Sequence, residues 1–329
     1  MHSNPLSEDQ LAVTAASMAG DAGRLYRIVS RLVDDGASFD SVLFDVLLPA
    51  ESDLGSRWQD GDYLVSEEHV ATATIETVIS LLAGAFDQPD DGTHVVVAVA
   101  EGDAHSLGSR ALAAYLLFLG FRTTFLGANV LAADLREYLE SEDPDALILS
   151  CTLPGQLVGA RAMIKAAHEA GVPVIAGGRA FGASGERAWE IGADSWLRTP
   201  REVPETLQTW APDTSATEEL ARDPDEELTD LLLRRSMVTA MAQTALAEDT
   251  GPDPDVRLNS EIDLLLGAVE GAMLVGDLSL ITETLGWQAD MLHAHGYTVG
   301  DAVRTALHQA LATSWPRAAG LLEQTSPSA

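Results

Sequence analysis

Five short apolar segments recur between residues 94 and 198, and they constrain the fold of this chain more than any other feature. Their apolar residues stand together in runs rather than alternating with polar ones, which is the pattern of strands covered on both faces in a parallel sheet. A helical pattern follows each segment, so residues 91–210 predict a doubly wound, five-stranded parallel sheet with strand order 2-1-3-4-5. The segments are HVVVAVA (94–100), RTTFLG (122–127), DALILSC (145–151), VPVIAGG (172–178) and DSWLR (194–198).

Helical patterns flank this predicted α/β domain on both sides. Residues 6–90 predict a small helical bundle, in which one helix starts at a Ser66 cap. Residues 211–227 are polar, acidic and proline-containing, which indicates a linker, and residues 228–325 predict a second all-helical part. The apolar stripes behind these predictions are Ile75, Val78, Ile79 and Leu82, then Ile262, Leu265, Leu266, Val269 and Met273, and finally Val303, Leu307 and Leu311. The expected fold class is therefore multidomain, α and α/β.

Charge and cysteine content narrow the classes of function. The 329 residues carry 51 acidic and 19 basic side chains, a formal net charge of −32 that repels phosphate backbones and anionic lipid surfaces. We therefore expect no direct nucleic-acid partner and no membrane association. Cys151 is the only cysteine, which excludes an intrachain disulfide and a multi-cysteine zinc site. The segment MHSNPLSEDQ lacks the pattern of a signal peptide, so we expect a cytoplasmic protein.

Three unusual loops follow the first, third and fourth predicted strands. They read EGDAHSLG (101–108), SCTLPGQ (150–156) and GGRAFG (177–182), and in a doubly wound sheet they open on one edge beside the topological switch point. A phosphate-binding loop is one alternative, but neither glycine-rich loop ends in lysine followed by a hydroxyl residue. The simplest alternative makes Asp103 a helix cap and His105 an exposed loop residue.

The combination of the three loops resembles the cobalamin-binding domain of methionine synthases, mutases and cobalamin photoreceptors, a flavodoxin-like fold. Asp103 to Gly108 match D-x-H-x-x-G, and Ser150 and the Gly177-Gly178 pair follow in the next two loops. The resemblance implies that His105 is the lower cobalt ligand, oriented by Asp103, and that the displaced nucleotide tail enters a slot between the loops. The family pattern S-x-L is replaced by Ser150-Cys151-Thr152, with Leu153 one place late. The implied cobalamin-binding residues of this domain are Asp103, His105, Ser106, Gly108, Ser150, Thr152, Gly177 and Gly178.

The helical region ahead of the sheet carries a second motif. Trp58 is followed after nine residues by Glu68-His69, and this W-x9-E-H spacing resembles the helical cap of the CarH-type adenosylcobalamin photoreceptors. The resemblance implies that Trp58 covers the adenosyl group, that Glu68 contacts it, and that His69 becomes the upper cobalt ligand after light breaks the cobalt–carbon bond. The alternative is a core tryptophan followed by two ordinary residues in the first turn of a helix.

The helical region after the sheet resembles the photocobilins by its length and place more than by a motif. In that family a globin-like domain holds biliverdin, a linear tetrapyrrole, as a second chromophore. A bilin needs cations for its two propionates and polar groups for its pyrrole nitrogens. With Cys151 in another domain, we expect non-covalent binding. The candidate biliverdin-binding residues are Arg234, Arg235, Arg257, Trp287, His293, His295, Tyr297, Arg304 and His308.

These resemblances together predict a non-enzymatic light sensor with adenosylcobalamin and biliverdin as cofactors. The basic DNA-binding domain that precedes the bundle in CarH-type photoreceptors is not expected here. Expected partners are the chromophores, a second copy of the chain in a light-dependent assembly, and a downstream protein. Two alternatives stay open: a corrinoid carrier of a methyltransferase system, and a cobalamin photosensor whose C-terminal helices bind only protein.

Overall fold

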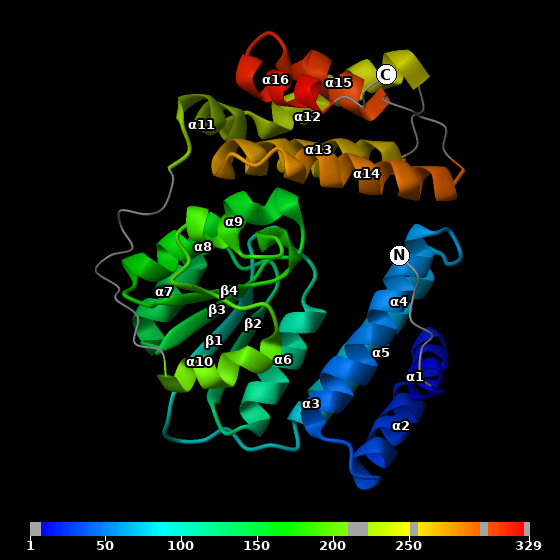
Figure 1. Ribbon diagram of the computed structural model, residues 1–329, viewed down its shortest axis with the longest axis vertical. Helices are drawn as coiled ribbons and strands as arrows, with labels where there is room; N and C mark the ends of the chain where they lie inside the picture. The colour runs from blue at the N-terminus through cyan, green and yellow to red at the C-terminus, as the bar shows by residue number, and fades with distance from the viewer. Residues whose placement is uncertain (1–7, 210–222, 251–255, 297–301, 326–329) are drawn as a thin grey trace.

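The computed structural model describes residues 8–209, 223–250, 256–296 and 302–325, which form three parts. An N-terminal helical bundle, blue in Figure 1, stands beside a central α/β domain, and a layer of C-terminal helices, yellow to red, lies across the ends of both. The predicted fold class is confirmed in this order of helical, α/β and helical parts. The prediction that the C-terminal part is globin-like is more specific than this order of parts and stays a prediction.

The bundle packs around a core of aliphatic side chains, and its longest helix, α5 (Val65–Ala83), buries Ile75, Val78 and Ile79 as predicted. The predicted Ser66 cap is wrong, because Leu64 is the N-cap residue and its backbone N–H donates to the Glu67 carboxylate at 2.8 Å. The helix thus starts two residues earlier than predicted, and the carboxylate three residues after the N-cap satisfies the backbone donor of the N-cap residue itself. The other elements are α1 (Glu8–Met18), α2 (Ala22–Asp34), α3 (Phe39–Ser41), the π-helix η1 (Val42–Leu47) and α4 (Leu48–Gln59).

The five strands form one parallel sheet of order β2-β1-β3-β4-β5, which confirms the predicted topology. All six residues of β1 are buried, and the apolar run Val95–Val99 suits a central strand. The order places β1 and β3 side by side, so the loops after them diverge at the switch point. The strands are β1 (His94–Val99), β2 (Arg122–Gly127), β3 (Ala146–Ser150), β4 (Val174–Gly177) and β5 (Ser195–Trp196).

Helices cover both faces of the sheet, which buries the strands. Apolar side chains of α6 and α10 pack on one face with Val95, Val97 and Ile148, while α7 and α8 pack on the other with Val96 and Leu147. The helices and short 3-10 turns of this domain are α6 (Leu107–Phe118), α7 (Ala132–Glu142), η2 (Pro154–Gln156), α8 (Leu157–Glu169), η3 (Arg179–Phe181), α9 (Glu186–Glu190), η4 (Pro200–Glu202) and α10 (Val203–Thr209).

The C-terminal part is all helical in its described residues. Its predicted apolar stripes are buried, which confirms them as core, and α11 begins at Glu226, so the end of the predicted linker is already helix. No described helix in the chain is both long enough and apolar enough to cross a membrane. The elements are α11 (Glu226–Leu233), α12 (Arg235–Thr250), α13 (Val256–Val275), α14 (Ser279–Ala294), α15 (Ala302–Leu311) and α16 (Pro316–Gln324).

Candidate functional site: a cobalamin site at the carboxyl edge of the sheet

The loop between β1 and α6 carries a buried carboxylate and an exposed imidazole. The Asp103 carboxylate is fully buried, and its Oδ1 lies 2.7 Å from His105 Nδ1. The same Oδ1 accepts the His105 backbone N–H at 3.0 Å. Because the carboxylate can only accept, Nδ1 carries the proton and Nε2 keeps its lone pair for another partner. The hydrogen bond that His105 donates to Asp103 raises the pKa of His105 above its ordinary value. This arrangement is that of a metal-ligating histidine fixed by a carboxylate.

The loop after β3 contacts this carboxylate, and the loop after β4 packs against the β3 loop. Asp103 Oδ2 accepts the backbone N–H of Thr152 at 2.6 Å, and Ser150 is the strand-end neighbour of Gly177. Gly178 has φ of +109°, and a Cβ there would lie 2.2 Å from the carbonyl oxygen of Cys151. Only glycine allows the backbone of the β4 loop to run this close to the β3 loop. The structure therefore brings the predicted lower-site residues together at one edge.

A second carboxylate and imidazole pair lies in the first turn of α5. Glu68 Oε2 is 2.6 Å from His69 Nδ1, while its Oε1 accepts the Thr72 hydroxyl at 2.7 Å. The side chain of His69 is 74% exposed, against 18% for Glu68, so the imidazole projects outward with Nε2 unused by Glu68. The same chemistry thus appears twice, once in the bundle and once in the α/β domain.

The two pairs are tied together by a contact that the sequence did not predict. The Ser106 hydroxyl, next to His105, donates to Glu76 of α5 at 2.7 Å. Glu76 follows Glu68 by eight residues, which is a rise of about 12 Å along the helix axis. The loop that carries His105 therefore contacts α5 about two turns after the Glu68-His69 pair. Gly108, the last residue of the motif, has open space where a Cβ would lie.

Glu51 of α4 is a further site residue that the motif missed. Burial, assisted by the charge of Glu68, raises its pKa, while His105 and Arg179 act in the opposite direction. Glu51 is thus within electrostatic reach of both the upper Glu68 and the lower His105. Its spacing of seven residues before Trp58 puts both on one face of α4, and this spacing could have identified it.

The candidate biliverdin residues do not converge in the described part of the chain. Arg234 pairs with Asp230 at 2.8 Å, and Arg235 contacts Glu270. His308 lies 3.0 Å from Glu323. Trp287 and His295 pack against Trp58 of the bundle, His293 is exposed and Arg304 is half-buried on α15. The side chain of Arg257 and the whole of Tyr297 lie outside the described residues.

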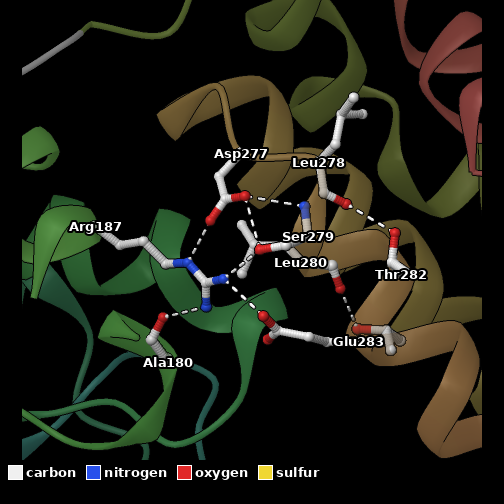
Figure 2. A network of polar contacts seen from close by, with 9 residues as sticks. Ala180, Arg187, Asp277, Leu278, Ser279, Leu280, Thr282 and Glu283 are labelled. Carbon is white, nitrogen blue, oxygen red and sulfur yellow. Dashed lines mark hydrogen bonds and ion pairs between the residues drawn. The ribbon is translucent and has the colours of Figure 1, made fainter. Parts of the chain in front are cut away.

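The C-terminal helices are docked on the loops that follow β3 and β4. Gly267 of α13 lies against Gly155 of η2 so closely that a Cβ on Gly267 would be 2.9 Å from the Gly155 Cα. Figure 2 shows Arg187 of α9 pointing at the start of α14, where its guanidinium contacts Asp277, Ser279 and Glu283 at 2.8 to 3.0 Å. The same guanidinium donates to the Ala180 carbonyl in η3 at 3.2 Å. One buried arginine therefore joins the β4 loop to α14.

Two separate parts of the chain match family models described as B12 binding domain. One match covers residues 93–206 and the other covers residues 12–83. The chain carries a B12-binding module. The residues present fit a cobalamin. His105 presents an imidazole nitrogen whose ring is held by a buried carboxylate, and Gly178 has no Cβ that would push the β3 and β4 loops apart.

The B12-binding module is CarH-like in sequence. The chain is 34% identical over 107 residues to the HTH-type transcriptional repressor CarH of Myxococcus xanthus, a match that covers 32% of this chain and 35% of that protein. It is 30% identical over 125 residues to the repressor CarA of the same organism, covering 37% and 42%. The matches thus span less than half the length of either relative. The absence of a nucleic-acid partner in this chain stays a prediction.

The fold also resembles that of a corrinoid protein. The monomethylamine corrinoid protein of Methanosarcina barkeri superimposes with a TM-score of 0.50 at 17% identity, over 60% of this chain and 95% of that one. This likeness concerns the fold, and it is consistent with a helical bundle joined to a doubly wound sheet.

Proposed function

We propose that this chain is a light sensor that uses adenosylcobalamin and acts without catalysing a reaction. The observation that carries the proposal is the repeated carboxylate and imidazole pair, Asp103 with His105 and Glu68 with His69. When bound, adenosylcobalamin supplies a cobalt–carbon bond that light breaks. A carrier needs one protein imidazole below the cobalt, whereas a sensor that changes its ligand in light needs a second one above it.

Each protein group has a distinct part in this proposal. His105 would hold the cobalt through Nε2, because Asp103 occupies Nδ1. Ser150, Thr152, Gly177 and Gly178 flank the slot for the nucleotide tail, and Trp58 and Glu68 enclose the adenosyl group. His69, whose Nδ1 is held by Glu68, would offer Nε2 as a second nitrogen ligand to the cobalt when the adenosyl group is absent.

The test is a set of visible absorption spectra in darkness and after green light. Protein reconstituted with adenosylcobalamin is expected to change its spectrum on illumination, and His69→Ala is expected to photolyse but give a different final spectrum and lose the cofactor more easily. His105→Ala should alter the dark spectrum while the fold is kept. Thr77→Ala, an exposed position on the same helix as His69, is the matched control. A wild-type spectrum that light leaves unchanged, together with preferential binding of methylcobalamin, would replace the sensor with a methyl carrier.

The proposal includes biliverdin as a second, non-covalent chromophore in the C-terminal helices. Its support is the architecture, an all-helical part docked on a cobalamin module, and not a set of cations around a pocket. Arg234 and Arg235 already have carboxylate partners, so the propionates would have to displace Asp230 or Glu270 or use cations elsewhere. Adding biliverdin to the full chain should give a red absorption band that acid denaturation releases as free pigment. Without such a band, the C-terminal helices are better explained as a protein-docking part.

A further inference from the structure

Trp58, at the end of α4, is packed against the C-terminal helix α14. The ring centroid of Trp58 lies 6.1 Å from the ring centroid of Trp287 and 6.0 Å from that of His295. His295 Nε2 donates a hydrogen bond of 2.9 Å to the backbone carbonyl of Trp58. Because a carbonyl oxygen only accepts, Nε2 is the protonated nitrogen of this imidazole. Both the ring and the backbone of Trp58 are therefore held by one helix.

The turn after Trp58 packs closely against the end of α14. Gly61 has φ of +81°, and a Cβ there would lie 2.8 Å from the carbonyl oxygen of Ala294. The backbone at the end of α4 thus touches the backbone at the end of α14. A movement of Trp58 toward or away from the cobalamin site has to disturb these contacts.

The indole N–H of Trp58 does not fix the ring within the described structure. Its Nε1 is buried and has no hydrogen-bond partner among the described residues. The orientation of the indole is consequently defined by the side chains that pack on it, and Trp287 and His295 supply two of these from the C-terminal part.

We propose that Trp287 and His295 are positioning residues for the upper face of the cobalamin site. They hold Trp58 in place, so the C-terminal helices set how strongly the cap prefers a large upper ligand over a small one. This inference rests on the proposed function, in which Trp58 covers the adenosyl group. Coupling of this kind is reciprocal, so the identity of the upper ligand also changes the contact between α4 and α14.

The test compares the dark dissociation constants of adenosylcobalamin and methylcobalamin for the full chain. His295→Ala and Trp287→Ala are expected to lower the preference for adenosylcobalamin by about three- to tenfold, the size of one aromatic contact. His295→Gln keeps an N–H donor and Trp287→Phe keeps a ring, so each should recover part of the preference. Asp290→Asn, an exposed position on α14, is the control and should leave it unchanged.

Trp58→Ala separates failure of this inference from failure of the proposed function. If Trp58→Ala lowers the preference for adenosylcobalamin but neither alanine variant on α14 does, the positioning role is overturned and the light sensor stands. If Trp58→Ala itself leaves the preference unchanged, Trp58 does not cover the adenosyl group and both fail. The dark spectrum of His105-bound cobalamin, together with far-UV circular dichroism, checks that each variant is folded. Should an alanine variant not fold, His295→Gln and Trp287→Phe decide: a preference between that of the wild type and that of Trp58→Ala supports the role, and a wild-type preference in both variants overturns it.

Discussion

Asp103 holds His105 by two hydrogen bonds to one oxygen, one from the ring and one from the backbone, at 2.7 and 3.0 Å. Its other oxygen accepts the Thr152 N–H, so the carboxylate also joins the β1 loop to the β3 loop. Burial alone would raise the pKa of Asp103, but the hydrogen bonds from His105 and Thr152 bring it below its ordinary value. The carboxylate therefore stays charged where a metal-binding imidazole needs it.

Asp103→Asn is expected to weaken cobalamin binding by about ten- to a hundredfold. An amide cannot reproduce the charge that holds His105, and its NH2 group would face either the imidazole or the Thr152 N–H. Equilibrium titration of the apoprotein with cobalamin, followed by absorption, measures the loss. Asp134→Asn, an exposed carboxylate in the first turn of α7, is the matched control, and equal affinities for the two variants would contradict the assignment.

The His105 ring should titrate above pH 6.5 in the apoprotein, because Asp103 favours its charged form. A pKa raised on folding contributes stability that is complete below the unfolded value and is lost as the pH rises through the folded value. The ring proton resonance of His105, assigned by comparison with His105→Ala, gives this pKa by NMR titration. A midpoint at or below 6.5 is incompatible with the pairing in the structure.

Because of Glu270, the stability of the C-terminal helices should fall as the pH rises, whereas a carboxylate with a lowered pKa makes stability rise with pH. Glu270 is only 2% exposed, and burial raises its pKa to about 7 despite the attraction of Arg235. Because the unfolded chain releases this proton first, stability falls as the pH rises from about 4.5 to about 7, by up to about 3 kcal/mol. Glu270→Gln should flatten the urea unfolding free energy over this range, whereas the exposed Glu226→Gln should not. An unchanged slope in Glu270→Gln would locate the pH dependence elsewhere.

Arg187→Met should loosen the C-terminal helices without unfolding the sheet. The Arg187 side chain is 8% exposed while Asp277 and Glu283 are 35% and 54% exposed, so the two carboxylates can return to water when the arginine is gone. We expect the loss of its charged hydrogen bonds to weaken the docking by roughly 1.5–3 kcal/mol. Hydrogen exchange of the backbone amides of α14 and η3 should accelerate in this variant and not in Arg136→Met, a surface ion pair on α7. Protection equal to the wild type would mean that the apolar contacts suffice.

The sheet and the lower cobalamin site were predictable because their signals are local. Uninterrupted apolar runs mark central strands, and the D-x-H-x-x-G spacing places Asp103 and His105 in one turn, where they were found to be bonded. Contacts between distant segments carry no such spacing. Nothing near Ser106 indicates its bond to Glu76, and nothing near Arg187 indicates Asp277, ninety residues away.

The predicted biliverdin cations show a different limit of sequence reasoning. Arginines were chosen because the two propionates of a bilin need cations, but in an acidic chain two of these arginines already pair with carboxylates. Arg234 has Asp230 one helical turn before it, and Arg235 has a buried glutamate on the neighbouring helix. Composition could identify the cations, and only the fold could show which partners they already have.

The contact of Gly155 with Gly267 bears on how the parts of this chain can be recombined with other proteins. A Cβ on either glycine would come within 3.2 Å of the backbone opposite, so α13 meets the β3 loop as two matched surfaces with no side chain between them. If the C-terminal helices were fused to another cobalamin protein through a linker alone, they would be covalently attached but would lack this contact. A working transplant has to carry residues 154–156 along with the helices, which makes this small turn, and not the linker, the true border of the C-terminal unit.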